Sequence, residues 1–333
     1  MKRRRPVHML ALALVLGVVA AVPSIAAADT SFPAAAGDMT ARGDLLVWTP
    51  WTGPGRLMSG FGDAAAPLPI PRARFGSVDL GTDARGRTVL AYKSCQAARP
   101  RHCAVYLYDF ASQRHRRLAA LDRSGCRVGD LRISRGTVAF ARYCSGSSGR
   151  RALDGLYLKR PRKPVRRLRG APRLEVLQPL GLPRLGSFDL AGATLAFIEH
   201  RVSNGPEEAT WRVTTELRVL RLGRRRSRLL VRERQLVAPA ESGAIVEDVR
   251  LDSGFAYWER QVFTEDFRQA ILRRPINGSA PATQLERAGR LYIGDHADEL
   301  GSYAVSGDRM YYSRLVTGSA AFIAQVAGTP VFR

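Results

Sequence analysis

The sequence contains little lysine, few histidines and no motif that names a reaction. Only four of the 52 basic residues are lysine, and five histidines occur in 333 residues. No G-x-S-x-G segment is present, so the nucleophile turn of the α/β-hydrolases is missing. No C-x-x-C pair is present, so a zinc site of the usual spacing is not expected. These absences exclude the simplest catalytic assignments, and we expect no catalytic residue, metal or other cofactor.

Long apolar segments are also rare, and the one that exists lies near the N-terminus. The basic segment Lys2–Arg5 precedes 14 consecutive nonpolar residues, Met9–Val22, and the small residues Ala26–Ala28 follow. This order is typical of a secretory signal peptide. The run is shorter than the roughly 20 residues that a membrane-spanning helix needs, although its retention as an anchor stays open. We expect cleavage after residue 28, no later transmembrane segment, and a secreted or extracytoplasmic protein at 29–333.

Acidic residues are scarce relative to basic ones. The chain has 29 Asp and Glu against 52 Lys and Arg, with a formal net charge of +23. Such a charge attracts anionic partners. The arginine clusters lack the interleaved aromatic side chains that stack on bases, and export separates the protein from the genome. We therefore expect no specific nucleic acid, and instead an envelope protein or an anionic cell-wall polymer, bound by a monomer.

A short pattern recurs six times along the rest of the chain. Each copy has two apolar residues two positions apart, as on one face of a β-strand. The first members are Leu46, Leu90, Val138, Leu195, Phe255 and Met310, and the second are Trp48, Tyr92, Phe140, Phe197, Tyr257 and Tyr312. A glycine that suits a tight hairpin turn precedes each copy, at Gly43, Gly86, Gly136, Gly192, Gly254 and Gly307.

Further apolar segments complete four antiparallel strands in each unit. The aromatic markers are 44, 48, 57, 60 and 55 residues apart, which is the spacing of propeller blades. Radial repetition also protects strand edges. We expect an all-β fold, a six-bladed β-propeller of four-stranded antiparallel blades that forms a single domain over 29–333. Its blades are expected at 36–71, 76–121, 128–169, 186–231, 246–286 and 300–333. Two stacked β-sandwich domains are the alternative.

The second unit resembles the repeat of TolB-like propellers. Its segments read TDARGRTVLAYKSC and VYLYDFASQRHRRL. The matching positions are Asp83, Gly86, Leu90, Tyr92, Tyr106, Asp109 and Leu118. The other units keep the strand pattern but lack the Pro-Asp-Gly turn of that family. The resemblance implies a secreted bacterial propeller with a protein-docking role in the envelope.

All four cysteines follow the predicted signal peptide, and an oxidising compartment favours disulfides. Cys95 ends the second strand of its unit and Cys103 begins the third. Cys126 precedes the first strand of the next unit and Cys144 ends its second. Adjacent antiparallel strands bring these ends together, so we expect the bridges Cys95–Cys103 and Cys126–Cys144. Cross-pairing between the neighbouring loops stays open.

Strand alternation divides the loops between two ends of the predicted propeller. The long loops share one end, at 93–104, 143–154, 200–214, 260–269, 172–185, 232–246 and 286–300. The acidic residues collect in this set. The arginine clusters lie at the turns between third and fourth strands, at the other end. We expect a polyanion to contact Arg116, Arg117, Arg166, Arg167, Arg224, Arg225 and Arg226, although exposed turns are commonly charged for solubility alone.

An extracellular hydrolase or lyase is the alternative function. Its site would lie at the hub, on the loop-rich end, and would need convergent acids with His200 or His296. All four histidines of the mature chain, His102, His115, His200 and His296, fall in predicted loops or turns, where solvated side chains are expected. The DHADE segment, 295–299, lacks the spacing of an EF-hand, so calcium is not expected.

Overall fold

The computed structural model describes most of the chain after the predicted signal peptide. The described residues are 30–33, 36–50, 55–60, 64–96, 99–121, 125–144, 153–207, 210–237, 242–263, 268–287, 298–307, 309–318 and 321–330. Antiparallel strands dominate them, and the described residues contain no α-helix, only the short 3₁₀ helix η2 (Ala119–Leu121). No helix in this part of the chain is long and apolar enough to span a membrane.

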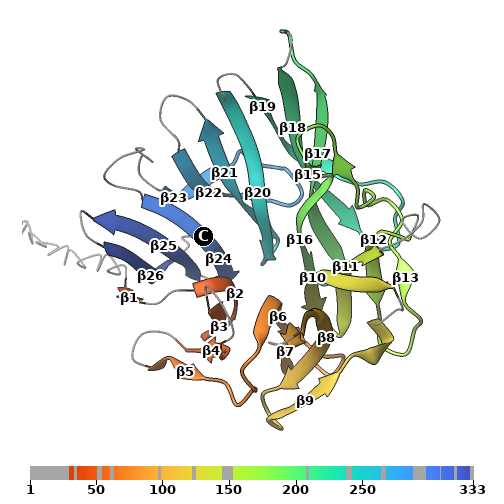
Figure 1. Cartoon of the computed structure of the whole chain (residues 1–333), viewed down its shortest axis with the longest axis vertical. Helices are drawn as coiled ribbons and strands as arrows, with labels where there is room; N and C mark the ends of the chain where they lie inside the picture. The colour runs from red at the N-terminus through yellow and green to blue at the C-terminus, as the bar shows by residue number, and fades with distance from the viewer. Residues whose placement is uncertain are drawn as a thin grey trace, which may run out of the picture.

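The first three units each form a four-stranded sheet in chain order (Figure 1). The first contains β2 (Ala36–Arg42), β3 (Leu45–Pro50), β4 (Met58–Ser59) and β5 (Ala66–Pro67). The second contains β6 (Arg74–Thr82), β7 (Thr88–Gln96), β8 (Arg99–Asp109) and β9 (Arg114–Arg117). The third contains β10 (Cys126–Ser134), β11 (Thr137–Cys144), β12 (Gly155–Lys159) and β13 (Arg166–Arg167).

The fourth and fifth units are joined into one eight-stranded sheet. Its first half contains β16 (Leu185–Ala191), β17 (Thr194–Asn204), β18 (Trp211–Arg221) and β19 (Arg228–Val237). Its second half contains β20 (Ser242–Asp252), β21 (Phe255–Phe263), β22 (Arg268–Pro275) and β23 (Thr283–Arg287). Gln235 pairs with Gly243 and Leu236 with Ser242 across the join. A small ribbon, β14 (Val176–Leu177) with β15 (Leu182–Pro183), precedes this sheet.

The last sheet takes a strand from the other end of the chain. It contains β24 (Asp298–Ser306), β25 (Arg309–Gly318) and β26 (Ala321–Pro330) in chain order. β1 (Thr30–Pro33) pairs with the outer edge of β26, with Thr30 opposite Gly328. The start and end of the described chain therefore share one four-stranded sheet, a pairing that the sequence pattern does not indicate.

The first strands of the six units lie around the centre of the molecule (Figure 1). Main-chain amides of these strands, or of the turns directly after them, donate to side-chain oxygens of a neighbouring inner strand and connect the strands in circular order. These hydrogen bonds are Asp38–Val78, Asp79–Ile133, Ser134–Gly192, Asp189–Leu251, Asp252–Gly307 and Ser306–Gly43. The inner strands β2, β6, β10, β16, β20 and β24 are thus linked each to the next, and β24 to β2.

The predicted apolar columns form the core between neighbouring sheets. Their second members, from Trp48 to Tyr312, are all buried, and among the first members only Phe255 is half-buried. They lie on the second strand of each unit and belong to hydrophobic clusters that include residues of a neighbouring sheet. The six predicted turn glycines all have positive φ, between 57° and 84°. Both predictions are confirmed.

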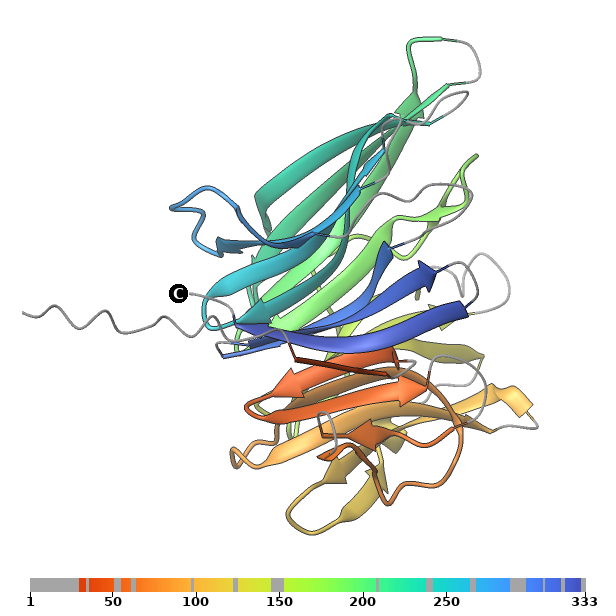
Figure 2. The same cartoon turned by 90° about the vertical axis from the view of Figure 1, so that its left-hand side faces the viewer.

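Several segments that the sequence analysis treats as loops are strand. β17 continues to Asn204 and β18 begins at Trp211, and this long hairpin extends beyond the neighbouring sheets (Figure 2). The prediction of a loop at 232–246 is also wrong, because β19 and β20 pair there. Both places contain runs of polar residues, and such a run does not distinguish a paired strand from a loop.

Candidate functional site

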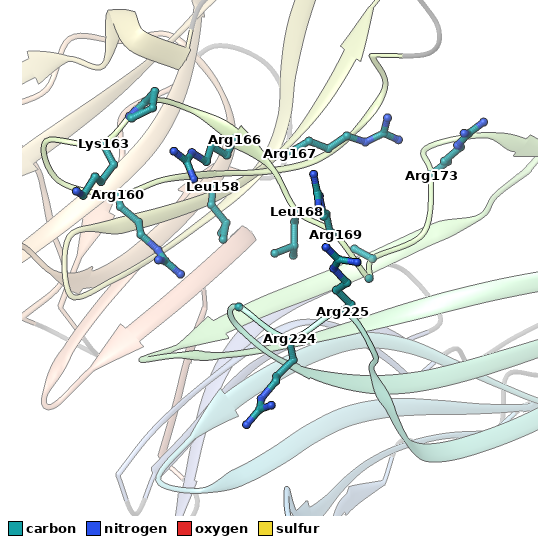
Figure 3. Close-up of a pocket in the computed structure, with 14 residues that line it drawn as sticks. Leu158, Arg160, Lys163, Arg166, Arg167, Leu168, Arg169, Arg173, Arg224 and Arg225 are labelled. Carbon is teal, nitrogen blue, oxygen red and sulfur yellow. The ribbon is translucent and has the colours of Figure 1, made fainter.

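A broad basic groove separates the β10–β13 sheet from the β16–β23 sheet (Figure 3). Its volume is about 1210 Å³. Eight of the 14 lining residues are basic, and they are Arg160, Lys163, Arg166, Arg167, Arg169, Arg173, Arg224 and Arg225. None of the described residues that line it is acidic. Leu158 and Leu168 form its apolar floor, so the groove combines a shallow apolar base with cationic walls.

Tight turns hold these cations in place. On the β12–β13 side, Arg162 has a φ of 54° and the Lys159 ammonium donates to the Lys163 carbonyl at 2.5 Å. On the β18–β19 side, the turn contains Gly223 with a φ of 96°. The two sides meet at Gly170, where a Cβ atom would lie 2.6 Å from the Arg225 carbonyl oxygen. Only glycine therefore allows this close approach of the two walls.

The seven arginines predicted to bind a polyanion lie in two separate parts of the structure. Arg166, Arg167, Arg224 and Arg225 line the basic groove, and Arg226 is exposed in the same β18–β19 turn. Arg116 and Arg117 lie on β9, in a different sheet, and both are exposed. The groove is also lined by Arg160, Lys163, Arg169 and Arg173, which are not among the seven predicted residues.

Both disulfides have the predicted pairing, Cys95–Cys103 and Cys126–Cys144. In each case the two cysteines are register partners on adjacent antiparallel strands. No free cysteine remains in the described part of the chain.

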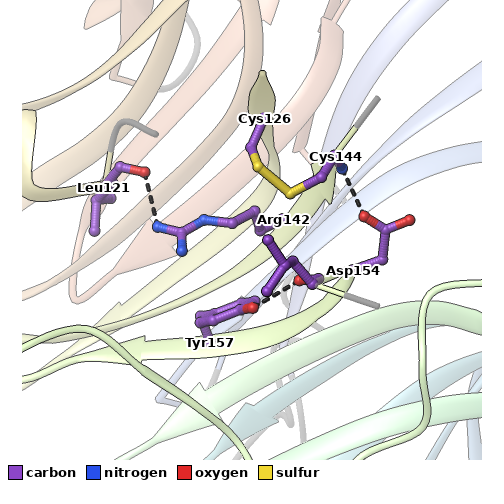
Figure 4. Close-up of a disulfide and its surroundings, with 7 residues drawn as sticks. Leu121, Cys126, Arg142, Cys144, Asp154 and Tyr157 are labelled. Atoms are coloured by element: carbon purple, nitrogen blue, oxygen red, sulfur yellow. Dashed lines mark hydrogen bonds between the residues drawn. A yellow bond between two sulfur atoms is a disulfide. The ribbon is translucent and has the colours of Figure 1, made fainter. Parts of the chain in front are cut away.

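Charged and aromatic side chains surround the second bridge (Figure 4). The amide of Cys144 donates to the Asp154 carboxylate at 2.6 Å. The Arg142 guanidinium lies 4.5 Å from the centroid of the Tyr157 ring and donates to the carbonyl at the end of η2. The Cys126–Cys144 bridge is therefore part of a packed end of the β10–β13 sheet.

Each inner strand carries a β-bulge that presents polar groups to the centre of the molecule. The register shifts at the same place in all six first-strand pairs. The bulge residues alternate between aspartate and serine along the chain, as Asp38, Ser77, Asp130, Ser187, Asp248 and Ser302. Two residues later stand Thr40, Asp79, Arg132, Asp189, Arg250 and Ala304. Bulges re-aim side chains in this way and are common beside functional sites.

These polar groups satisfy the free edges of the inner strands. An edge strand exposes main-chain N–H groups that need acceptors. Asp79 accepts from the Ile133 amide at 2.5 Å, and Asp189 accepts from the Leu251 amide at 2.6 Å. Two of the three serines act in the same way, because Ser77 accepts from the Leu131 amide and Ser187 from the Val249 amide. The Ser302 hydroxyl instead donates to the Gly37 carbonyl. The central carboxylates therefore link the inner strands.

Two arginines offset part of the charge of the four carboxyl groups in this cluster, which we call the hub cluster: Asp38, Asp79, Arg132, Asp189, Asp248 and Arg250. Arg132 lies 3.6 Å from Asp189, and Arg250 lies 3.1 Å from Asp248. Burial, and then the neighbouring Asp189 carboxylate, raises the pKa of Asp79 to about 7. Burial likewise raises the pKa of Asp38 against the pull of Arg132 and Arg250. None of these six side chains was predicted from the sequence as a site residue.

A cavity of about 570 Å³ lies over the hub cluster. Asp79, Asp189 and Arg250 line it, together with turn residues such as Gly43 and Gly192. These turns follow the inner strands, so the cavity lies at the opposite end from the loop-rich end where the alternative enzyme site was expected. Groups of three or more potential metal ligands are absent from the described residues.

The prediction that the histidines lie in loops or turns is wrong for the three described ones, which all lie in strands. His200 is not a solvated loop residue, because it lies in β17, is only 8% exposed and contacts the Thr215 hydroxyl at 3.3 Å. Burial lowers its pKa. His115 is exposed on β9. His102 lies in β8, and His296 lies outside the described residues, as does most of the DHADE segment.

The comparisons with known proteins concern fold alone. Neither a protein-family model nor a curated protein matches the chain. The polysaccharide lyase Uly1 is 12% identical, with 78% of this chain and 59% of the lyase covered at a TM-score of 0.42, so the chain spans about three fifths of that protein. A protein of unknown function from Dyadobacter fermentans is 12% identical, with 90% and 95% covered at a TM-score of 0.43.

The β-propeller domain of the trilobed protease from Pyrococcus furiosus is 9% identical, with 91% of this chain and 99% of that domain covered at a TM-score of 0.39. The similar structures thus include an enzyme and a propeller domain. At these identities and TM-scores they assign neither an activity nor a ligand to this chain.

Proposed function

We propose that the protein is an extracytoplasmic, non-catalytic six-bladed β-propeller that binds an anionic polymer of the cell envelope in the basic groove. The circular linkage of six inner strands supports the blade count, with β1 completing the last blade. Two disulfides support an oxidising compartment. The observation that carries the function is the groove itself, with eight cations and no acidic residue among its described lining.

The TolB-like assignment belongs to this proposal. Its motif residues act together in the structure, because Arg87 pairs with Asp83 at 2.7 Å and with Asp109 at 2.9 Å. Asp83 also accepts from the amides of Arg85 and Arg87 in the turn before β7. The two aspartates of the motif thus fix the two turns of one blade. This supports membership of the TolB-like group without identifying a partner.

A polymer suits the groove better than a small anion. The cations stand along two walls from different sheets, and an extended polyanion can contact both walls at once. Exposed arginines contribute little singly, but their summed potential attracts such a chain with a strong dependence on salt. The apolar floor at Leu158 and Leu168 accommodates the uncharged backbone between anionic groups.

The test is binding to polyphosphate and to purified anionic wall polymer at low and high salt. The groove variant carries Gln at Arg166, Arg167, Arg224 and Arg225. A matched control carries Gln at four exposed arginines elsewhere, Arg85, Arg114, Arg234 and Arg309, so both lose the same charge. We expect the groove variant to bind at least about tenfold more weakly and the control to bind within about twofold of wild type. Equal loss in both variants would show that net charge alone attracts the polymer.

The hub cluster is the observation that favours the alternative, a hydrolase or lyase. Asp79 has a pKa of about 7, and perturbed carboxyls are common in active sites. Asp79 and Asp189, however, each accept from a main-chain amide of the next inner strand, which assigns them a structural role. Turnover of polysaccharide or ester substrates that is lost in Asp79→Asn would favour the enzyme.

A further inference from the structure

A second hollow, separate from the basic groove, lies on one face of the β6–β9 sheet. Its volume is about 460 Å³, within the range of small-ligand sites, roughly 300–1000 Å³. The linker Ile70–Ala73 forms one wall, and strands β7, β8 and β9 form the floor. The Ala73 amide and carbonyl bond to Gly55, which ties this wall to the preceding unit.

The hollow exists because large and small side chains stand side by side in the sheet. Tyr92 pairs in register with Tyr106, and the next pair on the same face is Ser94 with Ala104. Two large rings are thus followed by two small side chains, and the surface steps down between them. The Cys95–Cys103 bridge closes the strand ends directly beyond. The depression therefore has a fixed frame.

The rings in the hollow form a platform. Tyr92 is buried, and its ring stacks on Tyr106 with centroids 5.4 Å apart and planes 18° apart. Tyr106 is half-buried, so part of it faces the hollow. His115 meets Tyr106 edge-on at 6.0 Å. Tyrosine supplies an apolar ring face together with a polar hydroxyl tip, which is the surface that a sugar ring needs.

The guanidinium groups beside the platform belong to Arg72 and Arg117. His115 also lines the hollow, and no acidic residue is among its described lining. Arginine recognises carboxylates and sulfates through its planar set of donors. Ser94 adds a hydroxyl that can both donate and accept. A ring face, a hydroxyl and guanidinium groups together fit a ring-shaped ligand that carries an anion and hydroxyls.

The geometry points to a binding site for one acidic sugar unit, a pyranose that carries a carboxylate, at Tyr106, Ser94 and Arg117. This inference rests on the proposed function and makes it more specific, because it assigns the anionic polymer to the acidic polysaccharides. The basic groove would bind any polyanion by charge, whereas the hollow selects the sugar. Arg117, predicted from the sequence as part of a polyanion surface, belongs to this second site.

The experiment compares a polysaccharide acid, polygalacturonate, with polyphosphate, which has charge and no sugar. Ala104→Tyr fills the hollow and leaves the groove intact, and Ala111→Tyr, in the exposed β8–β9 turn, is the matched control. We expect Ala104→Tyr to weaken polygalacturonate binding about tenfold, as the loss of one ring contact predicts, and to leave polyphosphate binding unchanged. Arg117→Gln removes the guanidinium group without filling the hollow, and it should also weaken polygalacturonate binding.

Free galacturonic acid separates this inference from the proposed function. It is expected to shift the ring signals of Tyr106 and His115 in NMR spectra of the wild type and not of Ala104→Tyr. If the protein binds polyphosphate through the groove but neither galacturonate nor its polymer, the sugar site is wrong and the groove stands. If it binds galacturonate but neither polymer, the hollow stands and the proposed function is wrong. Equal polygalacturonate binding by wild type and both hollow variants would overturn the site.

Discussion

The Arg250 guanidinium on β20 lies 3.4 Å from the Asp38 carboxylate on β2, although β24 lies between these two inner strands. The same guanidinium donates to the Tyr303 carbonyl of β24 at 3.1 Å. One side chain therefore connects three consecutive inner strands. Arg132 makes the corresponding link between β10 and β16, through Asp189. Arg132 and Arg250 stand at the positions that Thr40, Asp79 and Asp189 occupy in three of the other inner strands.

Arg250→Met should destabilise the protein strongly. The change keeps much of the side-chain volume but leaves the Asp38 and Asp248 carboxylates without their cation. Breaking a buried ion pair in this way costs about 3–5 kcal/mol. Urea unfolding followed by tryptophan fluorescence measures the loss.

Arg135→Met is the control for Arg250→Met, because Arg135 is exposed at the rim of the same cavity. It should change the free energy of unfolding by no more than about 0.5 kcal/mol. If Arg250→Met is as mild as this control, the central ion pairs do not hold the inner strands together.

Stability should depend on pH through Asp79. Its pKa is about 7 in the folded protein, raised by burial and by Asp189, against about 3.9 in an unfolded chain. The folded state therefore binds a proton between these two values and the unfolded state does not. The free energy of unfolding should fall as pH rises from 5 to 8, by up to about 1.4 kcal/mol per pH unit for this group. Melting curves across this range give the slope.

Asp79→Asn isolates this effect, because asparagine can still accept from the Ile133 amide but does not titrate. Its unfolding free energy should vary less steeply with pH than that of wild type. His200, whose pKa is lowered by burial, acts in the opposite direction in both proteins and cancels in the comparison. Parallel pH profiles would show that Asp79 has an ordinary pKa.

Replacing each of two glycines at the basic groove by alanine should lower the stability of the protein by different amounts. Both have positive φ, 90° for Gly170 and 96° for Gly223, so each substitution carries a backbone cost of about 1 kcal/mol. At Gly170 the new Cβ would also lie 2.6 Å from the Arg225 carbonyl, whereas at Gly223 nothing lies within 4 Å. Gly170→Ala should therefore be more destabilising by at least about 1 kcal/mol.

Polyphosphate affinity, measured with the same pair of variants, tests whether the groove walls are coupled. Gly170→Ala should weaken binding, because it separates the two walls, and Gly223→Ala should leave it near wild type. Equal stability and equal affinity in the two variants would contradict the close approach of the β10–β13 and β16–β23 sheets.

The sequence predicted what depends on local periodicity. Leu90 and Tyr92 lie two residues apart after a turn glycine, and such a pattern has one structural meaning, a buried strand face behind a hairpin. The disulfide pairs followed from the same strand order. The groove could not be predicted in this way. Its walls carry Arg166 and Arg224, which belong to different sheets that meet only in the folded molecule.

The hub cluster was missed for a different reason. Asp79 stands between Val78 and Leu80, and alternation shows only that its face differs from the apolar one. It does not show whether that face meets water or the centre of a ring. The sequence nevertheless contains a signal for the bulges. In five of the six inner strands a glycine is followed by Asp or Ser and then by an apolar residue, as at Gly76-Ser77 and Gly186-Ser187. A Cβ at Gly186 would meet the His200 ring at 2.8 Å, which explains the glycine.

Removing either disulfide should lower stability, and the second more than the first. Cys95–Cys103 closes a segment with a sequence separation of 8 and Cys126–Cys144 one of 18. In the chain-entropy model such loops give about 2.5 and about 3 kcal/mol. The double variants Cys95→Ala with Cys103→Ala, and Cys126→Ala with Cys144→Ala, should show these losses in thermal unfolding without reductant.

Reductant distinguishes the covalent effect from the packing of the introduced alanines. Added to wild type, it should lower the midpoint by about as much as both double variants combined, because the sites lie on different sheets and their effects should add. Added to a variant that lacks all four cysteines, it should do nothing. A wild-type midpoint insensitive to reductant, with free thiols found by peptide mapping, would refute both bridges.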